Sequence, residues 1–158
     1  MSAKSKPLQV LFLHNLQGEG PIPSRLKAVA SCYGVKLLLP DWEGNRPGEV
    51  RTCLKKADAV LAVATSALHI PTVVDGLGVV ALSRPTLFLL ERRIPEATRQ
   101  EIKFLLGISV TEFDRAKLAG IELQVVRRAQ EDPRQCGRTL EALAHVVLGL
   151  LSLQRDPE

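Results

Sequence analysis

Four short runs of almost purely apolar residues recur along the chain, separated by segments of different character. The runs are LQVLFLHN (8–15), VKLLLP (35–40), AVLAVAT (59–65) and PTLFLL (85–90). Continuous apolar runs of this length are typical of parallel strands that are buried on both faces. Between them lie helix signals: Ser24 at a predicted N-cap, Gly34 at a predicted helix end, and Pro71 in a predicted first turn. Strands that alternate with helices predict an α/β fold with a mainly parallel sheet.

The second half of the chain continues this alternation. Pro95 and Gly107 bound a predicted amphipathic helix, in which Ile102, Leu105 and Leu106 are expected to face inward. Three further elements follow: a short strand or edge element at ISVTEF (108–113), a fifth main strand at IELQVV (121–126), and a final helix from about Gln135 to Leu153.

Length and composition fit one compact α/β unit. The chain has 158 residues, and 46% of them are hydrophobic but only 4% aromatic, so Leu, Val, Ile and Ala must build the core. We therefore predict a flavodoxin-like, doubly wound, mainly parallel five-stranded sheet with helices on both faces. Residues 8–154 are expected to form a single domain after a flexible tail, residues 1–7.

Several classes of protein are disfavoured by composition. Cys32, Cys53 and Cys136 are widely spaced and form no CxxC pair, which argues against a disulfide framework or a zinc site and favours a reducing, cytoplasmic location. No secretion signal or membrane-spanning stretch is predicted, since the longest apolar run, LAHVVLGLLSL, is too short. The net charge is +4, but the basic residues are scattered without interleaved aromatics, which argues against nucleic acid as a partner.

The predicted last helix is apolar on nearly all sides. Leu140, Leu143 and Val147 share one face, while Val146 and Leu150 extend the apolar surface around it. A helix of this kind needs cover on two sides. Two explanations stand equally: the helix forms a homodimer interface, or it is buried within the monomer.

The common phosphate and hydrolase motifs are missing. The chain contains no GxGxxG, no GxxxxGK[ST] and no GxSxG. Its histidines, His14, His69 and His145, lack the spacing of metal ligands. We therefore predict neither a metal nor a cofactor.

Polar residues follow the predicted strands at the edge where doubly wound sheets bind ligands. The first strand ends in His14, Asn15 and Gln17. They could hydrogen-bond a base or sugar, or simply form hydrogen bonds within a loop. Gly18 would let the backbone approach a ligand closely, or serve a turn. Trp42, the only tryptophan, could cover a nucleobase or cap the edge of the core.

Asp75 lies in a predicted helix among valines, leucine and glycines. A buried, unpaired carboxylate costs several kcal/mol, so Asp75 must reach solvent, find a partner, or stand in a polar pocket. It could also stabilise the helix N-terminus through the helix dipole.

The segment around Asp75 resembles the nucleoside 2-deoxyribosyltransferase-like families, which share a flavodoxin-like sheet with TIR domains. Their motif is an aspartate and a strand, a polar loop, then a helix reading roughly E-L-G-Y-A-x-A-L-G-K-P. Here Asp58 precedes AVLAVA, and DGLGVVALSRP places Asp75 at the glutamate position and Pro85 at the final proline. The match covers residues 8 to about 90, but Asp75 is one methylene shorter than the motif glutamate, and the family's first-strand motif is not recognisable in FLHNLQGEG.

The resemblance implies chemistry at an N-glycosidic bond, through an oxocarbenium-like transition state that a carboxylate stabilises. Asp75 would be the nucleophile or electrostatic stabiliser of a nucleoside or nucleotide N-glycosidase or glycosyltransferase. His14, Asn15, Gln17, Gly18 and Trp42 would surround the base, and Thr65 and Ser66 would lie near the sugar or phosphate. The alternative is a non-catalytic, TIR-like assembly domain that dimerises through its last helix. A weaker third option is a flavin-binding protein.

Overall fold

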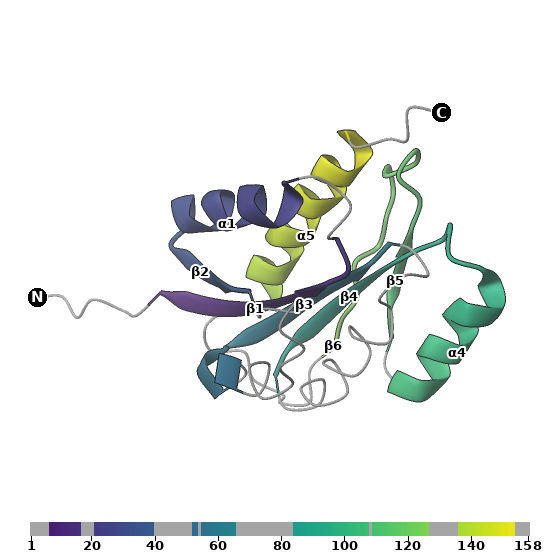
Figure 1. Cartoon of the computed structure of the whole chain (residues 1–158), viewed down its shortest axis with the longest axis horizontal. Helices are drawn as coiled ribbons and strands as arrows, with labels where there is room; N and C mark the ends of the chain where they lie inside the picture. The colour runs from purple at the N-terminus through teal and green to yellow at the C-terminus, as the bar shows by residue number, and fades with distance from the viewer. Residues whose placement is uncertain are drawn as a thin grey trace, which may run out of the picture.

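The sheet has the strand order of a flavodoxin-like fold. The computed structural model describes residues 7–16, 21–39, 52–53, 55–65, 84–107, 109–126 and 136–153. Its parallel strands are β1 (Leu8–His14), β2 (Val35–Leu38), β3 (Ala59–Ala64), β4 (Thr86–Glu91) and β5 (Thr111–Phe113). They lie side by side in the order β2-β1-β3-β4-β5 (Figure 1). This is the doubly wound 2-1-3-4-5 arrangement, so the predicted fold class is confirmed.

The fifth parallel strand does not come from the expected segment. It is β5, from the run expected to give only a short edge element, whereas 121–126 contributes the two-residue β6 (Val125–Val126). β6 runs antiparallel and pairs with Thr86 and Leu87 at the start of β4. The physical reason lies in the connection between β5 and β6. A strand that follows β5 in the parallel direction would need a crossover of about a dozen residues or more, usually a helix. Here the chain leaves β5 through turns that include Gly120 at φ 75°, and returns antiparallel.

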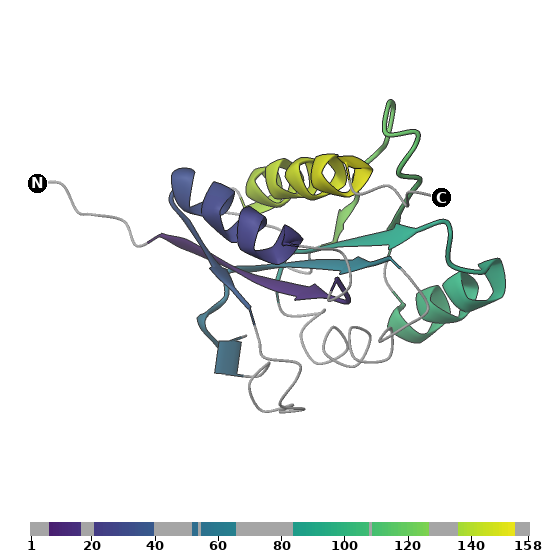
Figure 2. The same ribbon diagram turned by 45° about the horizontal axis from the view of Figure 1, so that its top comes forward.

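Each face of the sheet carries its own apolar core. Val10 and Phe12 point to one face, where α1 (Ile22–Cys32) and α5 (Cys136–Leu153) pack. Leu11 and Leu13 point to the other, and they belong to the same apolar cluster as Ile102 of α4 (Glu96–Leu106). Figure 2 shows α1 and α5 together on one side of the sheet and α4 on the other. Helices on both faces are therefore confirmed.

Helix α1 begins earlier than predicted. Ser24 was expected to cap it, but Pro21 is the N-cap, and Ser24 lies exposed within the first turns. The amide of Arg25 already donates to the carbonyl of Pro21 at 2.9 Å. Pro23 suits the first turn because its fixed φ is helical and its missing N–H would have no helical partner. The predicted end of the helix is confirmed, because Gly34 follows α1 with a φ of 73°.

Helix α4 touches the core along a narrower stripe than predicted. Ile102 is buried and Leu106 half-buried, as expected, but Leu105 is 65% exposed and Phe104 is 86% exposed. The expected inward position of Leu105 is therefore wrong. Because α4 lies at the margin of the sheet (Figure 1), it packs through residues four apart on a single stripe rather than through a broad face.

Helix α5 buries most of its apolar residues within the chain. Leu140, Leu143, Ala144, Val147, Leu148 and Leu151 all belong to the same core cluster as Val10 and Phe12. Val146 and Leu150 are half-buried against that cluster. Among the described helices, α5 alone is long and apolar enough to span a membrane by those two criteria. Burial in one chain accounts for these apolar residues but not for Leu153, which is 78% exposed, and the predicted homodimer stays a prediction.

Candidate functional site

Buried polar side chains gather where the parallel strands end. In the described part of the chain, seven polar or charged residues are buried. Two of them, Thr86 and Thr111, stand at the starts of their strands. The other five lie at or beyond the strands' carboxyl ends: His14, Asn15, Thr65, Glu91 and Arg115. In this strand order the topological switch point, where ligands bind in such folds, falls between β1 and β3.

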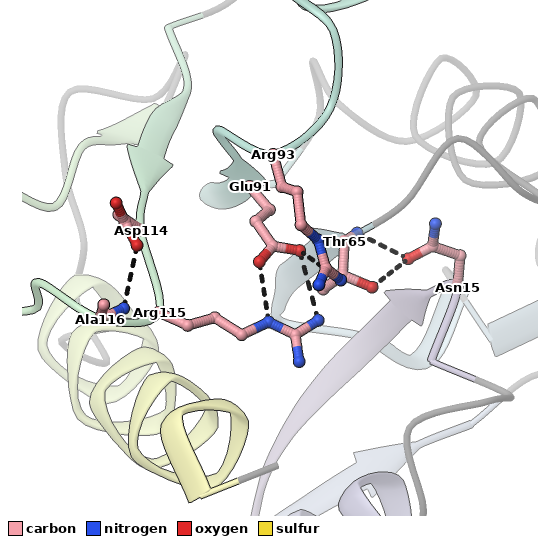
Figure 3. Close-up of polar contacts among 7 residues, drawn as sticks. All are labelled: Asn15, Thr65, Glu91, Arg93, Asp114, Arg115 and Ala116. Atoms are coloured by element: carbon pink, nitrogen blue, oxygen red, sulfur yellow. Dashed lines mark hydrogen bonds and ion pairs between the residues drawn. The ribbon is translucent and has the colours of Figure 1, made fainter. Parts of the chain in front are cut away.

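Asn15 ties the ends of β1 and β3 together at the switch point. Its Oδ1 accepts the backbone N–H of Thr65 at 2.9 Å, and the Thr65 hydroxyl lies 3.5 Å from the same oxygen (Figure 3). Both residues are buried. The sequence assigned Asn15 to a base and Thr65 to a sugar or phosphate. The structure brings the two together as a bridge between the ends of β1 and β3.

His14 is held as a buried, neutral imidazole. Its Nδ1 accepts the backbone N–H of Leu16 at 3.0 Å, and its ring stacks on Phe12 with centroids 4.9 Å apart. Burial lowers the pKa of His14 to about 4. Because Nδ1 acts as the acceptor, the single ring proton resides on Nε2. No group in the described part of the chain accepts that proton.

A charged cluster at the end of β4 was not foreseen from the sequence. Glu91, the last residue of β4, is 3% exposed and accepts two hydrogen bonds from the Arg115 guanidinium, at 2.8 Å from Nε and 3.3 Å from Nη2. Arg93 also reaches Glu91, with Nη2 3.5 Å from Oε1. A signal was available: a carboxylate directly after the apolar run TLFLL must be paired, because burying it alone is costly.

A second cluster lies on the neighbouring strand. Glu112 of β5 contacts Arg99 at 2.8 Å and Arg92 at 3.6 Å, and Lys103 forms a third ion pair with it. Burial by itself would raise the pKa of Glu112. The hydrogen bond from Lys103 and the positive charges of Lys103, Arg99 and Arg92 outweigh burial and lower that pKa below its usual value.

Five of the predicted site residues fall outside the described residues. They are Gln17, Gly18, Trp42, Ser66 and Asp75. The structure thus places His14, Asn15 and Thr65 at one edge of the sheet, as expected from parallel strands. It adds Glu91, Arg93 and Arg115 to them.

No family model matches the chain, and no curated protein matches its sequence. Two solved structures are similar in fold. CapF, crystallised with the inhibitor 3-isopropenyl-tropolone, has a TM-score of 0.48 and 18% identity over 68% of this chain and 31% of its own. Rubredoxin oxygen:oxidoreductase from Desulfovibrio gigas has a TM-score of 0.43 and 8% identity over 95% of this chain and 37% of its own. The chain spans about a third of each, and neither likeness bears on what it binds.

Proposed function

We propose that the chain binds a nucleoside or nucleotide at the carboxyl edge of β1 and β3. The observation that carries this proposal is the state of His14. It presents a buried Nε2–H donor at the switch point, and no described group accepts it. Leaving a buried donor unsatisfied costs about 1–3 kcal/mol. A carbonyl or ring nitrogen of a base, or a sugar oxygen, would supply the missing acceptor.

Asn15 and Thr65 support the same proposal by shaping the site. Their hydrogen bond joins the two strands on either side of the switch point, and therefore fixes the distance between the ends of β1 and β3. Loops mounted on rigid strand ends hold ligand-contacting groups in place. In this proposal Asn15 and Thr65 are positioning residues.

The reaction proposed for this site is cleavage or transfer at the N-glycosidic bond, with Asp75 as nucleophile or electrostatic stabiliser. This part of the proposal rests on the resemblance of residues 58–85 to the deoxyribosyltransferase-like motif. The chemistry needs a carboxylate beside the anomeric carbon, where positive charge develops in the transition state. A neutral donor from His14 could hold the base while that bond breaks.

Binding is tested by thermal shift of the full chain against nucleosides, nucleoside monophosphates, NAD and cyclic nucleotides. A ligand at a hundred times its dissociation constant adds about 2.7 kcal/mol of stability, which is easily detected. His14→Asn is the informative variant, because the amide oxygen can still accept the Leu16 N–H while the Nε2 donor is removed. We expect it to weaken binding about tenfold, the value of one hydrogen bond.

The matched control is His145→Asn, since His145 is exposed on α5. It should bind as the wild-type chain does. The proposal is wrong if no member of the panel shifts the melting temperature, or if His14→Asn and His145→Asn bind alike.

Catalysis is tested separately by assaying any ligand that binds for released base. Asp75→Asn should abolish base release while the melting temperature without ligand stays unchanged. Unchanged turnover in Asp75→Asn would remove Asp75 from the mechanism and leave a binding site only.

A further inference from the structure

Strand β2 forms one edge of the sheet. It pairs with β1 on one side, and no described strand pairs with its other side, which we call the β2 edge (Figure 1). Successive backbone N–H and C=O groups of a strand point alternately to its two sides, so about half of those in β2 point away from β1. An edge of this kind can pair with a strand from another polypeptide.

A cavity of about 340 Å³ lies beside the β2 edge. Its apolar lining comes from Pro7, Val35 and Leu37, and α1 contributes Lys27 and Ser31. Because Val35 and Leu37 belong to the apolar core beneath α1, the cavity lies on the α1 face of the sheet. A strand added to β2 would direct every second side chain toward this face, where the cavity can receive an apolar one.

Lys36 stands on the opposite face of the same strand. Side chains alternate along β2, so Lys36, between Val35 and Leu37, points away from the α1 face. Lys36 and Lys27 are both exposed, and neither forms an ion pair within the part of the chain that the structure describes. An added strand would therefore meet an apolar cavity on one face and a lysine on the other.

We propose that the β2 edge binds an extended segment of a partner protein in which acidic and apolar residues alternate. The backbones pair as neighbouring strands, the apolar side chains enter the cavity, and an acidic side chain lies opposite Lys36. Opposite charges across neighbouring strands stabilise their pairing. This surface is separate from the proposed ligand site, because the cavity begins at Pro7, before β1, whereas His14 is the last residue of that strand.

A second copy of the chain fits the β2 edge less well. Pairing two β2 edges about a two-fold axis would bring the two Lys36 side chains directly or diagonally opposite each other. Like charges in this position destabilise the pairing, and lysines on edge strands commonly prevent self-association. The same lysine favours a partner segment that carries acidic residues.

The test titrates the full chain into a fluorescently labelled peptide of about six residues in which Glu and Leu alternate. We expect the Glu–Leu peptide to bind and to slow hydrogen exchange of the β2 amides. The corresponding Lys–Leu peptide should bind at least about tenfold more weakly. A Glu–Leu peptide with N-methylated backbone amides should not bind, because it cannot pair as a strand. Absence of Glu–Leu binding up to about 1 mM, or binding that leaves exchange in β2 unchanged, would overturn the proposal.

Lys36→Glu tests the charge at the β2 edge. It should lower the affinity for the Glu–Leu peptide about fivefold and raise the affinity for the Lys–Leu peptide. Lys117→Glu is the matched control, because Lys117 is also exposed but follows β5 at the other edge of the sheet. Both substitutions change the net charge equally. Equal effects of the two would contradict the proposal, since binding would then depend on net charge alone.

Ser31→Trp tests the cavity. Ser31 is exposed on α1, so the larger side chain can fill the cavity without entering the core, and Glu–Leu binding should weaken at least about tenfold. Ser24→Trp, which is exposed on the same helix, should bind the peptide as the wild-type chain does. If the two variants bind alike, the proposal is wrong. It is also wrong if the chain alone sediments as a dimer that Ser31→Trp converts to a monomer, because the β2 edge would then be an interface between copies.

Discussion

The charge state of His14 makes the stability of the molecule depend on pH. Its pKa is about 4 in the folded chain against 6.5 for an ordinary histidine. As pH falls below 6.5, His14 becomes protonated in the unfolded chain but stays neutral in the folded chain. Folding therefore becomes less favourable. The penalty is complete once pH passes below the folded pKa, and it amounts to on the order of 3 kcal/mol.

We expect His14→Asn to lose this part of the pH dependence. The measurement is the free energy of unfolding in urea between pH 7 and pH 4, as a difference between variant and wild type, so that the titration of carboxylates cancels. His145→Asn serves as the exposed control and should follow the wild-type curve. Parallel curves for wild type and His14→Asn would contradict a buried, neutral His14.

The sequence could identify His14 as a candidate site residue, but not its hydrogen bonding or its charge. A polar residue at the end of a buried strand is visible in LQVLFLHN. The bond from Leu16 to Nδ1 depends on the backbone turn after β1, and the stacking depends on the rotamers of His14 and Phe12. Arg115 could not be linked to Glu91 in advance, because the two are 24 residues apart and meet only through the pairing of β4 with β5.

Among the elements, α4 is bound to the sheet by ion pairs as well as by apolar contacts. Ile102 is its single buried residue, whereas Arg99 and Lys103 both bind Glu112 of β5. Glu112→Gln should therefore loosen α4 and lower the free energy of unfolding by about 1 kcal/mol, the scale of a partly exposed ion-pair network. Hydrogen exchange of the α4 amides should become faster.

Glu101→Gln is the control for this change, because Glu101 is exposed on the same helix. It should leave exchange in α4 as it is. If Glu112→Gln also leaves it unchanged, the helix is held by Ile102 and by its half-buried neighbours rather than by the ion pairs.

At the scale of the whole molecule, α5 closes one of the two cores. Leu140 of α5 is fully buried. It belongs to an apolar cluster that includes residues of β1, β3, β4 and α1. Leu140→Ala should lower the free energy of unfolding by about 2–5 kcal/mol, since it deletes buried methyl groups and leaves a cavity. Urea unfolding followed by circular dichroism measures this loss.

Leu153→Ala is the matched control, because Leu153 lies on the same helix but is 78% exposed. It should change the stability by less than about 0.5 kcal/mol. Deleting α5 is expected to unfold the chain, so sedimentation of the intact protein is the appropriate test of the predicted dimer. If Leu153→Ala changes the sedimentation coefficient while the free energy of unfolding stays the same, an interface between copies lies at the end of α5.

The sequence by itself determined the class of fold, because unbroken apolar strands alternating with helix signals have few other ways to bury their side chains. It also located the polar ends of β1 and β3, since parallel strands bring their carboxyl ends to one edge. Tertiary structure alone decided the direction of β6, the exposure of Leu105 and the union of Glu91, Arg93 and Arg115. The direction of β6 depends on which strand edge remains unpaired, and the exposure of Leu105 depends on where α4 meets the sheet. The contacts of Glu91, Arg93 and Arg115 depend on which distant side chains share a buried space. Local residue patterns carry none of that information.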